Sequence, residues 1–178
     1  MKRCPNCKAP SSLLRQAYVP HEARIGRRTF TGDLPAVRCG RCDSVFVHAP
    51  NVERFELIVA ERLARAGVSS GDAFRFMRKS LGVRAADLAT QIGVTPETVS
   101  RWEKGRRKVD HAALAVLGRL VVDRVQGRDE SRRLLEALRA PKPLARVIHL
   151  EEFRRKAVRR VDNIRGPKPA SKRRTAVG

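Results

Sequence analysis

The stretch from Ala85 to Lys104 reads AADLATQIGVTPETVSRWEK and decides the fold of the central part of the chain. Leu88 and Ile92 lie four residues apart, so both line the same face of a helix. Gly93 follows directly, and glycine ends helices because it adopts the left-handed conformation without steric cost. We therefore expect a first helix that stops at this glycine.

A second helix is predicted to begin immediately after the turn. Thr95 offers a hydroxyl that can cap a helix, and Pro96 fits the first helical position. Val99 and Trp102 lie three residues apart and form an apolar inner face. The opposite, outer face would carry Pro96, Glu97, Ser100 and Arg101.

An arginine exposed at the middle of a helix, in a chain of net charge +21, suits the major groove of DNA. The alternative interpretation is an ordinary helical hairpin whose charged residues are only solvated. We expect base or backbone contacts from the second helix and from the basic loop that follows it. These candidate DNA-binding residues are Thr95, Pro96, Glu97, Thr98, Ser100, Arg101, Lys104, Arg106, Arg107 and Lys108.

The block VSRWEKG at 99–105 resembles the phage-repressor (Xre/Cro-type) helix-turn-helix family. The resemblance implies that the second helix reads bases and that Arg78, on an earlier helix, pairs with Glu103. One departure concerns the start of the first motif helix. Arg84 and Ala85 stand where the family usually has a capping Ser or Thr and a phosphate-binding Gln. A phosphate contact from Arg84 would substitute, so this residue joins the DNA-binding set.

The composition points to a polyanionic partner. The 178 residues give a pI near 11.4, which favours nucleic acid first and an anionic membrane second. The net charge is +6 over 1–50, +5 over 51–127 and +10 over 128–178. The longest apolar run lies within Ala112–Leu117, too short to span a membrane, and no secretory signal begins the sequence. We expect a cytoplasmic protein with no membrane partner and with reduced cysteines.

All four cysteines belong to Cys-x-x-Cys pairs, Cys4 with Cys7 and Cys39 with Cys42. Two such pairs supply the four thiolates that a structural zinc ion prefers. We predict one structural zinc per chain, with a redox pair or unrelated thiols as the alternatives. Four protein ligands leave no open position for a substrate, so a zinc enzyme is not expected. The four histidines are scattered and fit packing or surface roles better than ligation: His21, His48, His111 and His149.

The segment between the two cysteine pairs has the pattern of a β-hairpin. Tyr18-Val19 and Arg28–Phe30 flank Gly26, and we expect the second strand to end at Gly32-Asp33. About fifty residues cannot bury enough apolar surface to fold alone. The metal is therefore a physical requirement of this module.

The order of a four-cysteine module and then this helix-turn-helix resembles the YgiT/MqsA-type antitoxin family. The resemblance covers about residues 1–125 and rests on CPNC at 4–7, LPAVRCGRC at 34–42 and SRWEKG at 100–105. It implies a structural zinc domain that contacts a partner toxin, and a C-terminal domain that dimerises and represses its own operon. This chain departs from the family at Asp43, where glycine is usual, and by running about fifty residues beyond the helix-turn-helix.

These patterns predict an α+β chain. A β-rich zinc-binding module precedes an all-α, five-helix, phage-repressor-like helix-turn-helix domain and a basic C-terminal extension. The first domain helix is expected from Asp72 to Leu81, and Asp110 should cap a wide apolar helix that we assign partly to a dimer interface. The expected units are 1–50, the zinc-binding module ending in a short strand at Ser44–His48; 51–68, a linker helix; 69–127, the helix-turn-helix domain; 128–165, a helical basic extension; and 166–178, a disordered basic tail.

The leading hypothesis is a sequence-specific repressor of antitoxin type that binds a pseudo-palindromic operator as a homodimer. The alternatives are a stand-alone zinc-finger and helix-turn-helix regulator without a toxin, and a non-specific nucleic-acid-binding adaptor. Platforms for single strands or RNA stack bases on aromatic side chains, and this chain is only 4% aromatic. We expect no enzymatic activity.

Overall fold

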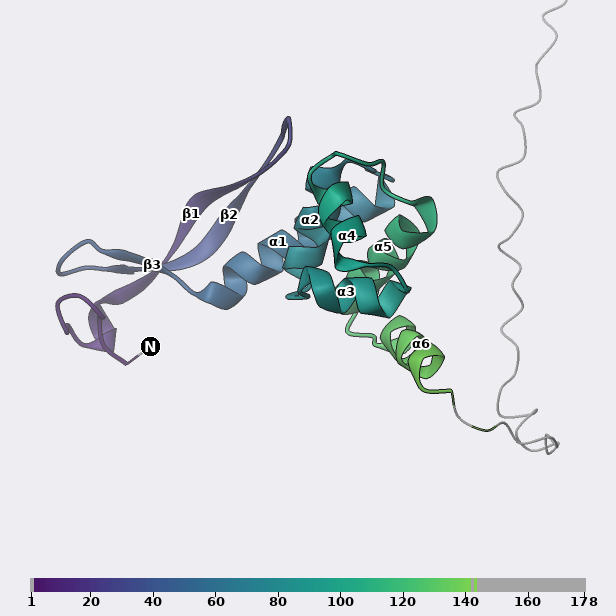
Figure 1. The fold of residues 1–178 in the computed structure, drawn as a ribbon. Coiled ribbons are helices and arrows are strands. Elements are labelled where there is room, and N and C mark those ends of the chain that lie inside the picture. The colour runs from purple at the N-terminus through teal and green to yellow at the C-terminus, as the bar shows by residue number, and fades with distance from the viewer. Residues whose placement is uncertain (1, 142, 144–178) are drawn as a thin grey trace, which may run out of the picture. The chain divides into compact units, whose positions relative to one another are not determined.

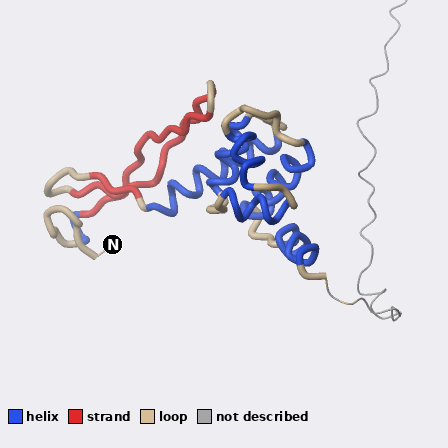
Figure 2. Tube along the Cα trace, viewed as in Figure 1, coloured by secondary structure: helices blue, strands red, loops and turns tan. Residues whose placement is uncertain are grey.

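A computed structural model of the chain describes residues 2–141 and 143, and Figures 1 and 2 show the arrangement of its elements. The predicted extension beyond residue 143 and the predicted tail at 166–178 lie outside the described residues. The elements in chain order are η1 (Ser11–Leu13), β1 (Leu14–Ile25), β2 (Arg28–Cys39), β3 (Val45–Val47), α1 (Ala49–Arg65), α2 (Gly71–Ser80), α3 (Ala85–Ile92), α4 (Pro96–Glu103), α5 (His111–Val125) and α6 (Glu130–Arg139).

The predicted hairpin is present, and it is longer than the sequence indicated. β1 and β2 pair antiparallel from Leu14 opposite Cys39 to Ile25 opposite Arg28, and β3 extends the sheet on the far side of β2. The expected end of the second strand at Gly32-Asp33 is wrong, because β2 continues through both residues. Gly32 serves packing instead: a Cβ there would lie 2.8 Å from the Phe55 ring of α1.

Helices α1 to α5 share one apolar core, so the five-helix domain includes α1 as its first helix. The buried face of α1 carries Val59, Ala60 and Leu63. Gly118 of α5 lets α1 approach closely, since a Cβ there would lie 3.3 Å from the Cβ of Ala64. The helix after residue 50 thus both connects the two modules and forms part of the core. The core residues are Ala23, Ile25, Val59, Ala60, Leu63, Ala73, Phe74, Met77, Leu88, Ala89, Val99, Trp102, Val109, Ala113, Leu117 and Val121.

Part of the wide apolar face of α5 is covered within the chain itself. Ala113, Leu117 and Val121 are buried in the core, and α1, α2 and α6 all pack against this helix. Exposed large apolar side chains remain on both C-terminal helices: Val125 of α5 is 37% exposed, and on α6 Leu134 is 67% and Leu138 78% exposed. The assignment of part of α5 to a dimer interface stays a prediction.

Asp123 fixes the joint between α5 and α6. Its carboxylate is buried and accepts a hydrogen bond from the backbone N–H of Ser131 at 3.2 Å. Its Oδ1 atom also lies 3.0 Å from Nη2 of Arg119 and 3.6 Å from Nε of Arg128. The Ser131 hydroxyl and these arginines outweigh burial and lower the pKa of Asp123, so the carboxylate stays ionised.

The tip of the hairpin packs on the helical domain. Ala23 and Ile25, near the end of β1, belong to the same core as the helices. A Cβ at Gly26 would lie 3.0 Å from Oδ2 of Asp72, in the first turn of α2. Along the part of the chain that the structure describes, no helix is long and apolar enough to cross a membrane.

Candidate nucleic-acid interface and metal centre

The turn between α3 and α4 has the predicted geometry. Gly93 is left-handed, with φ 71° and ψ 32°, and the N–H of Val94 donates to the carbonyl of Ala89 at 3.0 Å. Thr95 caps α4, because its Oγ1 accepts from the N–H of Thr98 at 3.3 Å, and Pro96 occupies the first turn. Local sequence chemistry therefore fixes where α4 begins.

The inner face of α4 anchors it in the core. Val99 is fully buried, and Trp102 is 3% exposed. The Trp102 ring meets Phe74 of α2 edge to face, with ring centroids 5.7 Å apart and the planes at 76°. Aromatic pairs prefer this geometry, so α4 is held against α2 in one orientation.

The predicted pair of Arg78 and Glu103 is confirmed, and it joins α2 to the end of α4. Nη2 of Arg78 donates to Oε2 of Glu103 at 3.0 Å, and Nε donates to Oε1. Nη1 donates to the carbonyl of Val83 at 2.6 Å. Both charged side chains are only 10% exposed, so this bidentate pair is shielded from solvent.

The predicted reading face of α4 points away from this anchor. Pro96, Glu97 and Arg101 are exposed, as is the capping Thr95, while Thr98 and Ser100 are partly buried. The carbonyl of Arg101 accepts from the N–H groups of Arg106 and Arg107 at 2.9 and 3.3 Å, which folds the loop back onto the helix end. The loop's side chains are all exposed: Lys104, Arg106, Arg107 and Lys108.

Arg84 lies at the N-cap of α3 but does not cap it with its side chain. Its guanidinium instead donates to both carboxylate oxygens of Asp87, at 2.8 and 2.9 Å. The same hydrogen bonds lower the pKa of Asp87. A phosphate contact from Arg84 would thus compete with a carboxylate on its own helix.

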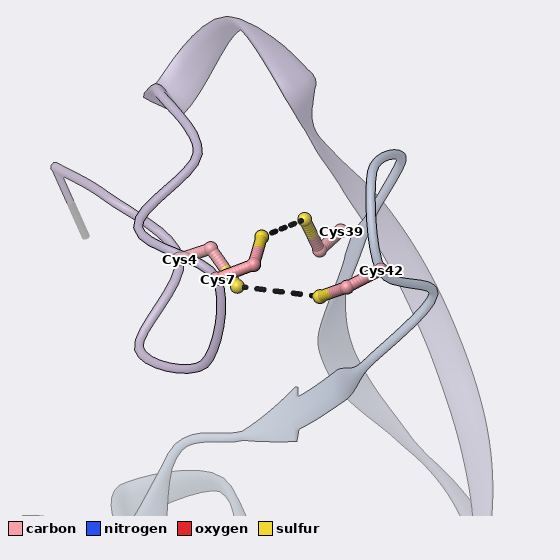
Figure 3. Close-up of side chains that lie close together, drawn as sticks. All are labelled: Cys4, Cys7, Cys39 and Cys42. Carbon is pink, nitrogen blue, oxygen red and sulfur yellow. Dashed lines mark hydrogen bonds between the residues drawn. The ribbon is translucent and has the colours of Figure 1, made fainter.

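The four cysteines converge on one point, as Figure 3 shows. Sγ of Cys4 lies 3.7 Å from Sγ of Cys42, and Sγ of Cys7 lies 3.7 Å from Sγ of Cys39. All four sulfur atoms lie within 4.8 Å of one another. A tetrahedral zinc site with bonds of about 2.3 Å needs sulfurs about 3.8 Å apart, so this cluster fits that ion.

Each Cys-x-x-Cys pair lies on a tight backbone turn. The N–H of Lys8 donates to the carbonyl of Cys4 at 3.0 Å, and that of Asp43 donates to Cys39 at 2.9 Å. Lys8 and Asp43 adopt left-handed conformations, with φ 59° and 55°. Aspartate tolerates this region better than most side chains, and Arg38 donates to both Asp43 carboxylate oxygens at 2.9 and 3.0 Å. The departure from glycine at this position therefore leaves the turn intact.

Hydrogen bonds bias the thiols of the second pair toward the thiolate that binds metal. The hydroxyl and the backbone N–H of Ser44 lower the pKa of Cys42 to about 6. The N–H groups of Cys42 and Arg41 lower the pKa of Cys39. At Cys7 the N–H of Ala9 acts in the same direction, but burial and the neighbouring sulfurs outweigh it and raise the pKa to about 11. A bound metal must therefore displace a proton from Cys7.

Sequence reasoning missed two polar residues around the cluster. Asn6 donates through Nδ2 to Oγ of Ser44 at 2.9 Å, and this hydroxyl lies 3.3 Å from Sγ of Cys42. Both could have been found from their positions in the sequence, because Asn6 lies inside the first Cys-x-x-Cys pair and Ser44 lies just after the second. His21 packs edge to face on Phe55, with ring centroids 5.2 Å apart, in line with the packing role expected for it.

Residues 74–114 match the family model described as Helix-turn-helix, which is of the Xre type. The match spans most of α2, all of α3 and α4, and the start of α5. No curated protein matches the chain. A domain of this kind binds DNA and is typical of non-enzymatic transcriptional regulators. The predicted Arg78–Glu103 pair lies inside the matched segment.

Proposed function

We propose that this protein is a sequence-specific DNA-binding transcriptional repressor, and that it is the antitoxin of a type II toxin–antitoxin pair that represses its own operon. One observation carries the DNA-reading part of the proposal. The two large apolar residues of α4 are buried, whereas Glu97 and Arg101 on the same helix are exposed. A helix anchored on one side presents the other side to a major groove.

In this proposal two copies bind a pseudo-palindromic operator, with one α4 in each of two successive major grooves. Half-sites would then lie about one helical turn, or 34–36 Å, apart. The exposed leucines of α6, Leu134 and Leu138, are one helical turn from each other and offer an apolar surface to a second copy. Their exposure supports the dimer, as does that of Val125 at the end of α5.

The cysteine cluster holds one structural zinc ion in this proposal. Cys4, Cys7, Cys39 and Cys42 would supply all four ligands, and the ion would serve to fold the module. The antitoxin assignment rests on the order of this module and the helix-turn-helix, which resembles the YgiT/MqsA-type family. A regulator of the same build without a toxin is the competing function.

Two experiments test the proposal. Selection from a randomised duplex library should enrich one pseudo-palindromic sequence, and footprinting should protect its two half-sites. If no sequence is enriched, binding is non-specific, and the proposed function as a sequence-specific repressor is contradicted. Co-expression with the product of the neighbouring open reading frame should then yield a co-purifying complex that relieves toxicity. A non-toxic, non-binding neighbour would favour the stand-alone regulator.

A further inference from the structure

The hairpin brings a group of arginines to the helical domain. β1 and β2 each hold twelve residues, so the hairpin spans about 40 Å from the cysteine cluster to its tip. Arg27 lies in the turn, and Arg24 and Arg28 lie beside it. All three are exposed, and Arg24 reaches the nearby Glu22 at 3.0 Å. The tip is therefore a basic surface far from the metal centre.

This tip touches the first turn of α2. Gly26 has φ 58°, a conformation that suits glycine in a two-residue hairpin turn, and it lies against Asp72. Ile25, the residue before it, is 6% exposed and part of the helical core. The tip is thus fixed to the N-terminal end of α2.

The same end of α2 also touches the end of α4. A Cβ at Gly71 would lie 2.2 Å from the carbonyl oxygen of Trp102 and 3.0 Å from that of Glu103. Gly71 and Asp72 are consecutive, so the hairpin tip and the C-terminal end of α4 meet neighbouring residues of one helix turn. The basic loop that follows α4 begins at Lys104, next to this contact.

We propose that the hairpin tip is a second DNA-contacting surface, in which Arg24, Arg27 and Arg28 bind backbone phosphates that flank the half-site read by α4. This inference rests on the proposed DNA-binding function. The tip and the loop at 104–108 would form one basic surface around the N-terminus of α2. The ligand is duplex backbone rather than unpaired bases, because the nearest aromatic residue of the tip, Phe30, is partly buried against the core.

Phosphate binding by the tip predicts a specific change in salt dependence. Each phosphate contact contributes about 0.9 to the slope of log K against log salt. The double variant Arg27→Ala, Arg28→Ala should therefore lower the slope by about 1 to 2. It should lower the affinity for operator DNA and for random DNA by the same factor, since backbone contacts carry no sequence information.

Matched variants separate this role from folding and from general charge. Arg15→Ala, Arg41→Ala removes the same charge at the cysteine end of the hairpin, where Arg15 and Arg41 are exposed, and should leave the slope unchanged. Arg27→Lys, Arg28→Lys should restore most of the slope. On a duplex trimmed to the half-sites, the wild type and the Ala variant should bind equally.

The measurement is competition binding at several salt concentrations, after thermal melting and metal content show that each variant is folded. An unchanged slope in the tip double variant, with the operator still bound, would overturn the inference and leave the proposed function standing. An equal loss in the variant at the cysteine end would overturn it too. Failure of the wild type to bind DNA would refute the proposed function itself.

Discussion

The helical domain and the cysteine module are held together by different forces. Among the described residues, sixteen buried side chains form the core shared by the helices and the hairpin tip. The cluster around the cysteines buries three, Cys4, Ala9 and Cys39, with partly buried neighbours such as Leu14 and Phe46. Apolar burial stabilises a domain by roughly 25 cal/mol per Å² of buried surface. The first cluster buries enough apolar surface to stabilise the helical domain, whereas the second is too small to stabilise the cysteine module. The difference teaches that the two ends of one hairpin have separate sources of stability.

Metal removal should give the largest effect, and it should be confined to one region. Protein purified without added zinc should carry one zinc ion per chain. Chelation should then unfold the cysteine module, because apparent zinc-binding energies of about 10–16 kcal/mol have no replacement there. Limited proteolysis should cut at 2–14 and 39–47, while the helices stay protected. A stoichiometry near zero with a protease-resistant N-terminal segment would contradict the metal site.

Breaking the buried ion pair should give the largest effect in the helical domain. Glu103→Ala strands the Arg78 guanidinium, which is 10% exposed, and should cost roughly 3–5 kcal/mol of unfolding free energy. Glu136→Ala removes an exposed partner of Arg132 and should cost about 0.3–0.5 kcal/mol. Thermal melting of both variants measures the difference. Equal melting temperatures would show that the ion pair does not stabilise the contact between α2 and α4.

A single added methyl group should test the contact between α2 and α4. Gly71→Ala places a Cβ against backbone carbonyls that cannot move aside, and overpacking of this kind costs about 1–3 kcal/mol. Gly118→Ala is the matched control, since its Cβ meets the methyl group of Ala64 at 3.3 Å and alanine favours the helix. Denaturant unfolding should show Gly71→Ala as the weaker protein. The reverse order would mean that the two helix ends are not in close contact.

The smallest effect concerns pH and the joint between α5 and α6. The pKa of Asp123 is lowered in the folded chain by Ser131, Arg119 and Arg128. Its stabilising contribution is therefore fully present above the unfolded value of about 3.9 and is lost as the pH falls through the folded value. Asp123→Asn should be less stable than the wild type at neutral pH, and the gap should narrow in acid. A gap that stays constant from pH 7 to acid would remove Asp123 from this role.

Local chemistry in the sequence predicted much of the candidate site. Gly93, Thr95 and Pro96 fix the turn through backbone conformation and capping, which depend only on neighbouring residues. The clustering of the four cysteines could be predicted equally well, since the Cys-x-x-Cys spacing places the two sulfur atoms of each pair close together. The resemblance to phage repressors supplied the pair of Arg78 and Glu103.

Contacts between distant segments could not be predicted in the same way. The strand was expected to end at Gly32-Asp33, yet β2 continues. Gly32 makes room for the Phe55 ring, and the Pro35 carbonyl accepts a hydrogen bond from the Asn51 side chain at 2.8 Å. The contact of Gly26 with Asp72 joins residues that no periodicity connects. Such information lies in the packing of elements, and only the three-dimensional structure supplies it.

The remaining comparison is between the residues proposed to read the DNA sequence and those proposed to bind the DNA backbone regardless of sequence. Arg101, on the exposed face of α4, should grip a guanine and contribute about 1–3 kcal/mol of discrimination. The loop residues Arg106 to Lys108 and the tail at 166–178 should bind phosphates regardless of sequence. Arg54→Ala, on the exposed face of α1, removes an equal charge away from α4 and is the control.

Competition between operator and random DNA at two salt concentrations tests this assignment most directly. Arg101→Ala should flatten the preference for the operator and leave the salt slope nearly unchanged, whereas deletion of 166–178 should lower the slope and keep the preference. Arg54→Ala should change neither quantity. If Arg101→Ala lowers the affinity for operator DNA and for random DNA by the same factor, α4 is not the helix that reads the sequence.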